Sequence, residues 1–322
     1  LDVLSYFADQ HKPLGLELPF PAGGMGFLSY EFARFCDTVA FRTKEDPLPL
    51  PEACFLFGHL YVIFDHYTDI LYLVALDYAE ARTDLEALVE RTERTLRNLD
   101  FTYLEEPEKG YAAEVSDNED ERRRYIEGVE QVRQRIVAGD ILQGVLSRRV
   151  SLRTTIAPLE AYRHLRGANP SPYLFFLDFG GYVLFGSSPE VHVKVKDGVA
   201  EIHPIAGTRR RGRTDAEDKA LEKELKEDEK ERAEHLMLVD LARNDLGRVC
   251  LPGTVEVAAF MEVERYSHVM HLVSRVRGTL ENPSCAGVIR ATFPAGTVSG
   301  APKLKAMEII DSLEAAPRGF YA

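Results

Sequence analysis

The sequence has few cysteines, and they lie far apart. Cys36, Cys54, Cys250 and Cys285 are the four in 322 residues, and none forms a CxxC pair or a His/Cys cluster. This spacing fits neither a structural zinc site nor a disulfide framework. A reducing compartment is the simple interpretation, so we expect a cytoplasmic protein.

Positive charge and long apolar runs are also scarce. The sequence has 39 Lys and Arg against 52 Asp and Glu, which gives a net charge of -13. Nucleic acids and anionic membranes bind basic surfaces, so we expect neither as a partner. No apolar run is long enough to span a membrane, and the first residues lack the pattern of a signal peptide. An anionic substrate would need local cations to offset the charge of this chain.

The remaining composition is that of a globular protein large enough for two domains. Hydrophobic residues make up 45% and charged residues 28% of the chain, which excludes wholesale disorder. Residues 100–118 are acidic and irregular, and they contain Pro107 and Gly110. Because such a stretch is typical of a domain boundary, we predict an N-terminal domain over 1–115 and a second domain over 116–322.

Hydrophobic periodicity predicts a mixture of helices and antiparallel strands. Two apolar runs, 60–64 and 70–76, flank a polar turn and predict a hairpin, and helical spacing follows over 80–99. A second hairpin is predicted where 173–179 and 182–185 flank Gly180-Gly181. Asp197-Gly198 predicts a further turn after an alternating strand. This antiparallel meander indicates the α+β class and argues against a doubly wound nucleotide-binding sheet.

Helical patterns mark three further stretches of the second domain. Tyr125, Val129, Val132 and Ile136 recur at helical spacing from Asp117 onwards, and Gly139 supplies a stop signal. The other patterns predict one long charged helix over 214–247, a strand over 266–277, and a glycine-containing turn that leads into a helix over 296–313.

A pair of glutamates three residues apart is a candidate metal site. On a helix Glu231 and Glu234 share a face, and such oxygen ligands suit Mg²⁺. The preceding charge run, 222–231, favours the simpler interpretation of a solvated helix face. Glu234, however, lies where the helix becomes apolar, and an unpaired carboxylate there is costly.

Glu190 follows a strand of the buried type, in the segment 186–190. A partly desolvated carboxyl at a strand end has a raised pKa and can act as a general acid. A surface turn capped by serine is the alternative, and the local pattern alone favours it.

The segment 296–303 superficially suggests a phosphate loop. Walker A loops need adjacent Gly-Lys-Ser/Thr within a parallel sheet, so we reject that interpretation. A turn that presents backbone N–H groups, Thr297 and a helix N-terminus can still bind a carboxylate. A plain capped helix fits the local pattern equally well.

Isolated histidines and a basic turn are weaker candidates. His271 lies between valines on one face of the predicted strand 266–277, where a histidine is more often a satisfied core residue than a base. His268 and His235 receive the same interpretation. The stretch 207–210 either binds an anion or forms a basic turn.

In their order along the chain, these segments resemble the chorismate-utilising enzymes. Within that family the sequence is most similar to the large subunits (component I) of anthranilate synthases. The resemblance covers nearly the whole chain. It rests on segments 139–143, 169–173, 186–190, 204–208, 231–245, 270–274 and 296–303.

Two positions distinguish the branches of this family. Members that add water have a lysine at the position that matches Gln143, and aminodeoxychorismate synthases have a nucleophilic lysine where this chain has Ala206. Neither residue here can do that chemistry, so the resemblance implies amine addition in an anthranilate synthase. Gly144 departs from the apolar residue usual at its position, and the sequence offers no account of it.

The resemblance implies an anthranilate-synthase-like α+β fold, with antiparallel sheets packed as a sandwich and helices outside. The implied reaction is amination of chorismate by ammonia and elimination of pyruvate, which gives anthranilate, the first step of tryptophan biosynthesis. One alternative is an aminodeoxyisochorismate-type synthase that stops before elimination. The other is a truncated, non-catalytic remnant, because the family's catalytic domain continues past Tyr321 with further metal-ligand glutamates.

The resemblance also implies roles for individual residues. Mg²⁺ would be bound directly by Glu234, and Glu231 would act on its water shell. Glu190 would protonate the leaving hydroxyl, Gln143 would replace the water-activating lysine, and His271 would assist elimination.

Substrate, partner and inhibitor follow from the same resemblance. Gly207, Thr208, Thr297 and Tyr321 would hold the substrate carboxylates. Ammonia would come from a glutamine amidotransferase subunit (component II), since the chain shows no Cys–His glutaminase. Pro172-Tyr173-Leu174 matches part of the family's tryptophan feedback site.

Overall fold

The computed structural model describes residues 1–10, 18, 24–46, 48, 50–98, 100, 110–116 and 119–321. They form two compact units, one of Leu1–Phe27 with Cys54–Gly110 and one of Leu28–Ala53 with Tyr111–Ala322. The structure differs from a single boundary at residue 115, because residues 28–53 cluster with the larger unit. All candidate site residues lie in that larger unit. No helix within the described residues is long and apolar enough to cross a membrane.

The smaller unit contains the predicted N-terminal hairpin. Strands β3 (Leu60–Asp65) and β4 (Ile70–Ala75) pair antiparallel along their full length, and Asp69 takes a positive φ of 57° in the turn. The prediction of a hairpin here is confirmed. Around it lie α1 (Asp2–Asp9), β1 (Met25–Leu28), β2 (Ala53–Leu56) and α2 (Leu85–Arg97).

Helix α2 is shorter than the predicted 80–99 because a side chain marks its start. Asp84 accepts a hydrogen bond from the backbone N–H of Ala87 at 3.0 Å, the usual N-cap arrangement. The helix therefore begins at Leu85 and not at Glu80.

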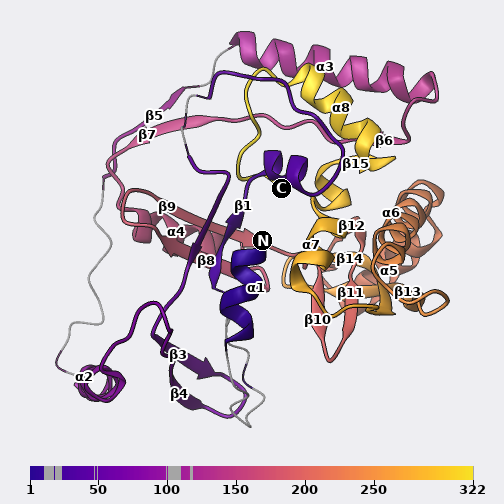
Figure 1. Ribbon diagram of the computed structural model, residues 1–322. Helices are drawn as coiled ribbons and strands as arrows, with labels where there is room; N and C mark the ends of the chain where they lie inside the picture. Colours follow the sequence, from indigo (N-terminus) through magenta and orange to yellow (C-terminus); the bar gives the residue numbers. More distant parts are fainter. Residues whose placement is uncertain are drawn as a thin grey trace. The chain divides into compact units, whose positions relative to one another are not determined.

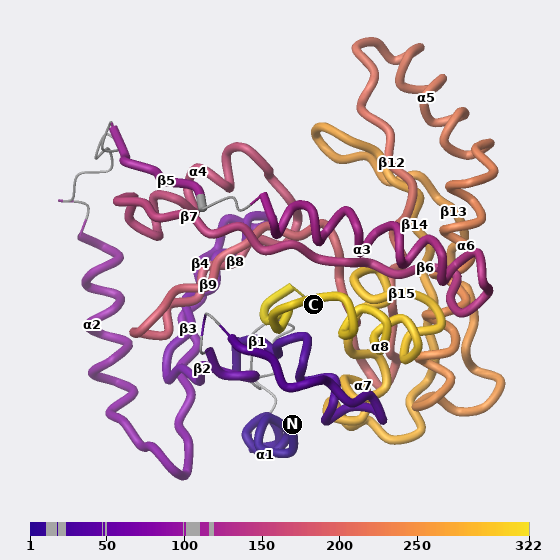
Figure 2. Tube along the Cα trace, turned by 90° about the horizontal axis from the view of Figure 1, so that it is seen from above, coloured from indigo at the N-terminus to yellow at the C-terminus, as the bar shows by residue number. Residues whose placement is uncertain are grey.

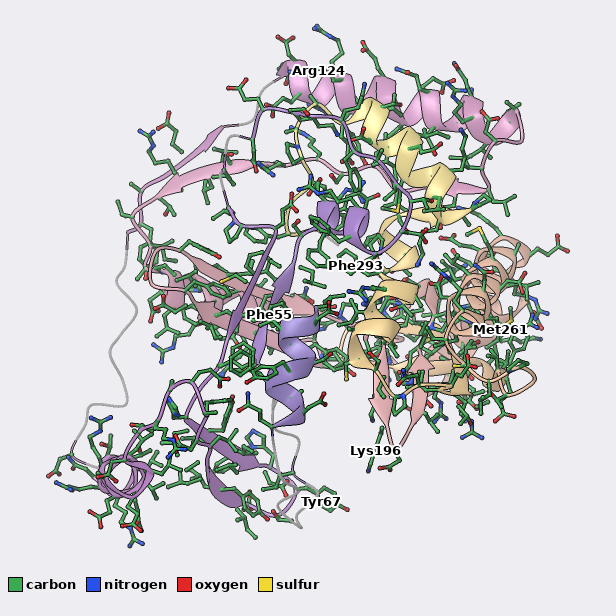
Figure 3. All side chains as sticks on the ribbon, in the orientation of Figure 1. Phe55, Tyr67, Arg124, Lys196, Met261 and Phe293 are labelled. Atoms are coloured by element: carbon green, nitrogen blue, oxygen red, sulfur yellow. The ribbon has the colours of Figure 1, made fainter. Side chains whose placement is uncertain are left out.

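The centre of the larger unit is a five-stranded antiparallel sheet around β14 (Figure 1). One edge of β14 pairs with both β11 and β12, and the other edge pairs with β13. The predicted meander is confirmed, and its tight turn is formed by Asp197 and Gly198, both with positive φ. Lys196 lies at the tip of this turn (Figure 3). The strands are β10 (Lys194–Lys196), β11 (Val199–Ile202), β12 (Ile205–Arg210), β13 (Glu256–Arg265) and β14 (Val269–Thr279).

Two helices replace the single helix predicted over 214–247, so that prediction is wrong. Helix α5 (Asp215–Glu227) ends at Asp228, whose ψ of 111° is not helical. The Asp228 carboxylate then caps α6 (Glu229–Gly247) by accepting from the N–H groups of Lys230 and Glu231 at 3.0 and 3.1 Å. An N-capping aspartate is favourable here because it satisfies N–H groups that the helix leaves free.

Helix α6 packs its apolar side against the sheet. Val239, Ala242 and Leu246 of the helix join Ala200 and Val276 of the strands in one buried cluster. This packing explains why apolar residues recur along one side of the second half of α6.

The remaining elements of the larger unit surround this sheet and helix. Helix α3 (Glu119–Val137) lies beside α8 (Lys303–Leu313) in both views (Figures 1 and 2), where Val132 packs with Ala306 and Ile309. The predicted start of α3 at residues 117 and 118 lies outside the described residues. The others are η1 (Tyr30–Phe35), β5 (Ala113–Ser116), β6 (Gln143–Gly144), β7 (Ser151–Thr154), α4 (Pro158–Ala168), β8 (Tyr173–Asp178), β9 (Val183–Ser188), α7 (Cys285–Thr292), η2 (Gly296–Val298) and β15 (Gly300–Ala301).

The hairpin β8–β9 confirms the second predicted hairpin, with Gly180 at a φ of 81° in its turn. The short pair β6–β15 places Gly144 opposite Gly300. A Cβ at Gly144 would lie 3.1 Å from both Ile141 Cδ1 and Val132 Cγ1. A side chain at position 144 would therefore press on these two residues.

Candidate active site

The carboxyl of Glu190 is held in a partly buried turn after β9. Thr297 Oγ1, from η2, donates to Glu190 Oε1 at 3.0 Å. Burial raises the pKa of Glu190 from 4.5 to about 7, and the hydrogen bond from Thr297 opposes that rise. Ser188 does cap this turn, since its Oγ accepts from the Glu190 N–H at 3.2 Å. The segment is therefore both a serine-capped turn and the site of a partly desolvated acid. Its carboxyl can carry a proton near neutral pH.

Gln143 is hydrogen-bonded to Glu234, one of the two candidate metal ligands. Its Nε2 donates to Glu234 Oε1 at 3.1 Å, from β6 to α6. Its Oε1 is buried and has no hydrogen-bond partner in the described part of the chain. Buried acceptors are nearly always satisfied, so this oxygen can accept a hydrogen bond from water or from a ligand with an N–H or O–H donor.

Gly207 allows α6 to approach β12 closely at Glu231. The glycine has a φ of 72°, and a Cβ there would lie 3.0 Å from Leu225 Cδ1 and 3.2 Å from Glu231 Oε2. A larger residue would be strained in this backbone conformation and would push against the carboxylate.

Arg209 ties the start of α6 to the same strand. Its guanidinium lies 2.8 Å from Glu224 Oε1, 2.8 Å from Asp228 Oδ2 and 3.5 Å from Glu231 Oε1. One cation thus contacts the end of α5, the cap of α6 and a candidate metal ligand. The stretch 207–210 is therefore more than a basic surface turn.

Thr208 and His271 are cross-strand partners on β12 and β14. Thr208 Oγ1 lies 3.0 Å from His271 Nδ1, and the same nitrogen lies 3.2 Å from the Gly207 carbonyl oxygen. With its proton on Nδ1, the ring has Nε2 as its basic nitrogen. The Tyr266 ring meets His271 edge-on at 5.5 Å between centroids.

The other two histidines are not candidates for catalysis. His235 is fully buried, its Nε2 lies 2.7 Å from Ser274 Oγ, and burial lowers its pKa to about 4. It is a core histidine, as its sequence pattern favoured, although within the described residues only its Nε2 has a hydrogen-bond partner. His268 lies exposed on the connection between β13 and β14.

A buried ion pair close to these residues had no role in the sequence interpretation. Lys303 Nζ, at the start of α8, donates to Asp245 Oδ2 and to the Thr292 carbonyl oxygen, both at 2.7 Å. Burial raises the pKa of Asp245 to about 6, against the opposing effect of Lys303, and it lowers the pKa of Lys303. The signals that could have revealed it are Asp245 near the end of α6 and Lys303 directly after Pro302.

Comparison with known proteins identifies the family. Residues 3–322 match the family model described as chorismate binding enzyme. The chain belongs to this family.

Its curated relatives are named as anthranilate synthases. The chain is 58% identical to anthranilate synthase component 1 of Spirochaeta aurantia and covers 67% of that protein. It is 45% identical to the protein of the same name from Streptomyces coelicolor and covers 64% of it. It thus spans about two thirds of the length of these relatives.

Solved structures confirm the α+β fold class of this chorismate binding enzyme. Anthranilate synthase component I from Streptococcus pneumoniae superposes with a TM-score of 0.86 at 38% identity, over 99% of this chain and 72% of that one. The menaquinone-specific isochorismate synthase of Escherichia coli shares the fold more distantly, with a TM-score of 0.56 and 20% identity over 78% of this chain and 58% of that one.

The two glutamates of this chorismate binding enzyme suit one kind of metal ion. No group of three or more His, Cys, Asp or Glu within the described residues is placed to hold a metal. Mg²⁺ is commonly held by one or two carboxylates, with water and substrate oxygens as its other ligands. Glu231 and Glu234, one helical turn apart on α6, fit that mode of binding.

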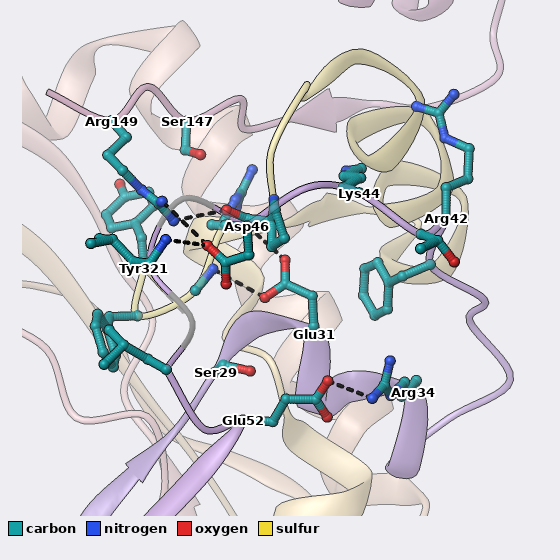
Figure 4. A pocket seen from close by; sticks show the side chains of 18 of the residues that line it. Ser29, Glu31, Arg34, Arg42, Lys44, Asp46, Glu52, Ser147, Arg149 and Tyr321 are labelled. Carbon is teal, nitrogen blue, oxygen red and sulfur yellow. Dashed lines mark hydrogen bonds and ion pairs between the residues drawn. The ribbon is translucent and has the colours of Figure 1, made fainter.

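Tyr321 lies in the wall of a different cavity from Glu190 and Thr297. This cavity has a volume of about 900 Å³ and is also lined by Asp46, Arg149 and Arg318 (Figure 4). The Arg318 guanidinium lies 5.7 Å from the centre of the Tyr321 ring. The structure therefore groups Gln143 with Glu234, Glu190 with Thr297, and Gly207 and Thr208 with His271, but it does not bring Tyr321 to Thr297.

The segment predicted to bind tryptophan lies on the strand next to that of Glu190. Tyr173 pairs with Ser188 and Leu174 pairs with Ser187 across the β8–β9 hairpin, and Pro172 directly precedes β8. This segment therefore lies beside the strand that leads into the acid.

Proposed function

We propose that this chain is the chorismate-binding part of an anthranilate synthase component I. The reaction is amination of chorismate by ammonia and elimination of pyruvate to give anthranilate, the first step of tryptophan biosynthesis. The names of relatives at up to 58% identity over the whole chain support it. The observation that carries the choice of reaction is Gln143, a neutral amide whose Oε1 is buried and has no partner among the residues that the structure describes.

Gln143 suits an ammonia nucleophile for a chemical reason. Because its Nε2 is bound to Glu234, the amide is held with Oε1 facing away from that carboxylate. This oxygen can accept a hydrogen bond from an N–H of ammonia, but it cannot take a proton from water as a lysine amine would. Amine addition follows from that limitation.

Glu190 is the proposed general acid. A pKa of about 7 leaves a large fraction of the carboxyl protonated at neutral pH, as an acid that works there requires. Its proton would go to the departing ring hydroxyl as ammonia adds, and Thr297 would keep the carboxyl oriented.

Mg²⁺ would be held by Glu234, with Glu231 on its water shell, and would supply positive charge for the carboxylates of chorismate. The positive charge would offset the net charge of -13 that the chain carries, which an anionic substrate requires. Arg209 lies 3.5 Å from Glu231, and Gln143 donates a hydrogen bond to Glu234.

His271 is the proposed base of the elimination. Its Nδ1 is engaged by Thr208 and the Gly207 carbonyl, which leaves Nε2 to take a ring proton as pyruvate leaves. Gly207, Thr208, Thr297 and Tyr321 would hold the substrate carboxylates.

The proposed partners follow from the same reaction. A glutamine amidotransferase subunit, component II, would supply ammonia, and tryptophan would inhibit at Pro172-Tyr173-Leu174. We place this biosynthetic enzyme in the cytoplasm.

The test is incubation of the full-length protein with chorismate, Mg²⁺ and ammonium. Fluorescent anthranilate and an equal amount of pyruvate are expected. Isochorismate or aminodeoxychorismate as the product would refute the proposal. Glu234→Ala should abolish turnover and leave the fold intact by circular dichroism, whereas Glu229→Ala, on the exposed first turn of the same helix, should be active.

Two alternatives are separated by simple assays. An aminodeoxyisochorismate-type synthase would consume chorismate and ammonia without releasing pyruvate, and a role for His271 argues against it. A non-catalytic remnant would be inactive as the 322-residue chain, so turnover by this chain alone would exclude that alternative.

A further inference from the structure

A small cavity lies directly behind Glu190 and Thr297. Its polar lining comes from Glu190, His192, Asp245, Thr292 and Thr297, and its other walls include Ile202 and the apolar face of α6. Its volume is about 30 Å³. A water needs roughly 10–15 Å³ and two or more polar partners, so the cavity has the size and the chemistry to hold at least one water.

His192 brings an unsatisfied acceptor to this cavity. Its Nε2 is buried and has no hydrogen-bond partner among the residues described. Burial lowers the pKa of His192 to about 4, so the ring is neutral at pH 7. The backbone of Thr292 hydrogen-bonds the ring, and with Nε2 unpartnered that bond falls to Nδ1. Nε2 is therefore a buried acceptor whose lone pair needs a hydrogen-bond donor.

The carboxyl of Glu190 also has acceptor positions that lack hydrogen-bond donors. Thr297 donates to Oε1 only, while an ionised carboxylate offers about four acceptor positions on its two oxygens. A carboxylate left in this partly buried turn after proton transfer lacks the hydration that would stabilise it in water.

We propose that this cavity binds an ordered water, which donates one hydrogen bond to His192 Nε2 and forms a second hydrogen bond with the carboxyl group of Glu190. His192 is then a positioning residue for the acid, because its acceptor nitrogen orients the water. The water is present in both states of the reaction: it accepts from the protonated carboxyl and donates to the carboxylate that remains. The role in catalysis rests on the proposed function, whereas the water site does not.

The other charged groups around the cavity leave this role to His192. Asp245 also lines it, but Lys303 holds that carboxylate at 2.7 Å. Arg248 and Asp37 act on the same ion pair with opposite signs, and Lys303 further lowers the pKa of His192. Since no donor in the described part of the chain reaches His192 Nε2, this nitrogen can accept a hydrogen bond from the water and orient it.

The test combines crystallography with titration of the substrate-free, full-length protein. A high-resolution structure should show a water within hydrogen-bond distance of His192 Nε2 and Glu190. Difference infrared spectroscopy, with Glu190→Gln as the blank, should follow ionisation of the Glu190 carboxyl. His192→Leu should raise the pKa of Glu190. Its acid dissociation constant should fall about tenfold.

Two further variants separate this role from a purely structural one. His192→Gln, which places an amide oxygen near the position of Nε2, should retain most of the ordinary titration. His203→Leu, a half-buried histidine that does not line the cavity, should leave the titration unchanged. No water in the cavity, or a His192→Leu protein that titrates like the wild type, would overturn the proposal. If His192→Leu fails to fold, the wild-type water and the His192→Gln titration decide.

Failure of this proposal and failure of the proposed function give different results. A shifted titration in a protein that makes no anthranilate would keep the water site and reject the function. Anthranilate production with an unshifted titration would do the reverse.

Discussion

The buried acid of this site should destabilise the protein at alkaline pH, and Glu190→Gln measures that cost. Burial raises the pKa of Glu190 from 4.5 to about 7 in the folded protein. The folded state therefore holds the proton more tightly than the unfolded state. Stability from this group is fully present below pH 4.5 and is lost as pH rises through about 7.

The expected size of the effect follows from that difference in pKa. Each unit corresponds to about 1.4 kcal/mol, so ionisation of Glu190 should cost the folded state about 3 kcal/mol at pH ~8 and less than about 1 kcal/mol at pH ~5. Glutamine has a similar shape and cannot ionise. Glu190→Gln should therefore be more stable than the wild type at pH ~8, by up to about 3 kcal/mol, and close to it at pH ~5.

Urea denaturation at both pH values, followed by circular dichroism, gives the two free energies of unfolding. The same variant should lose turnover, because it cannot donate a proton. Asp178→Asn, an exposed carboxylate at the end of β8, serves as the control and should show neither effect. Equal stability of Glu190→Gln and wild type at pH ~8 would refute the reasoning.

Three further predictions concern the residues that support the site. Lys303→Met leaves Asp245 buried without its partner and should cost about 3–5 kcal/mol in urea unfolding, and adding Asp245→Asn should recover part of it; a loss below about 1 kcal/mol would argue against a structural ion pair. Gly207→Ala should lower turnover more than stability, since the new Cβ lies 3.2 Å from Glu231 Oε2; Gly198→Ala has the same positive φ but open space around it, so it should lose only stability, by about 1–2 kcal/mol. Arg209→Lys cannot span Glu224, Asp228 and Glu231 together and should speed amide hydrogen exchange around 225–232, whereas Arg210→Lys, on the exposed side of the same strand, should not; unchanged exchange in Arg209→Lys would contradict the role of this arginine.

Local chemistry made much of this architecture predictable from the sequence. Asp197-Gly198 and Gly180-Gly181 can take the positive φ that tight hairpins need, and both hairpins form. The antiparallel class followed from these turns. The helix over 214–247 was mispredicted because its charged residues propagate a helix equally well on either side of Asp228, and the cap is visible only from where that carboxylate points.

The sequence by itself determined the family, the glutamate pair and the neutral amide at Gln143, because these depend on residue identity and order along the chain. Tertiary structure alone decided which groups meet and how deeply they lie. Gln143 reaches Glu234 across 91 positions of the chain, and Thr297 reaches Glu190 across 107. Packing between such distant segments buries Glu190 and raises its pKa. The same packing places Glu231 against Gly207. No local sequence pattern encodes either contact.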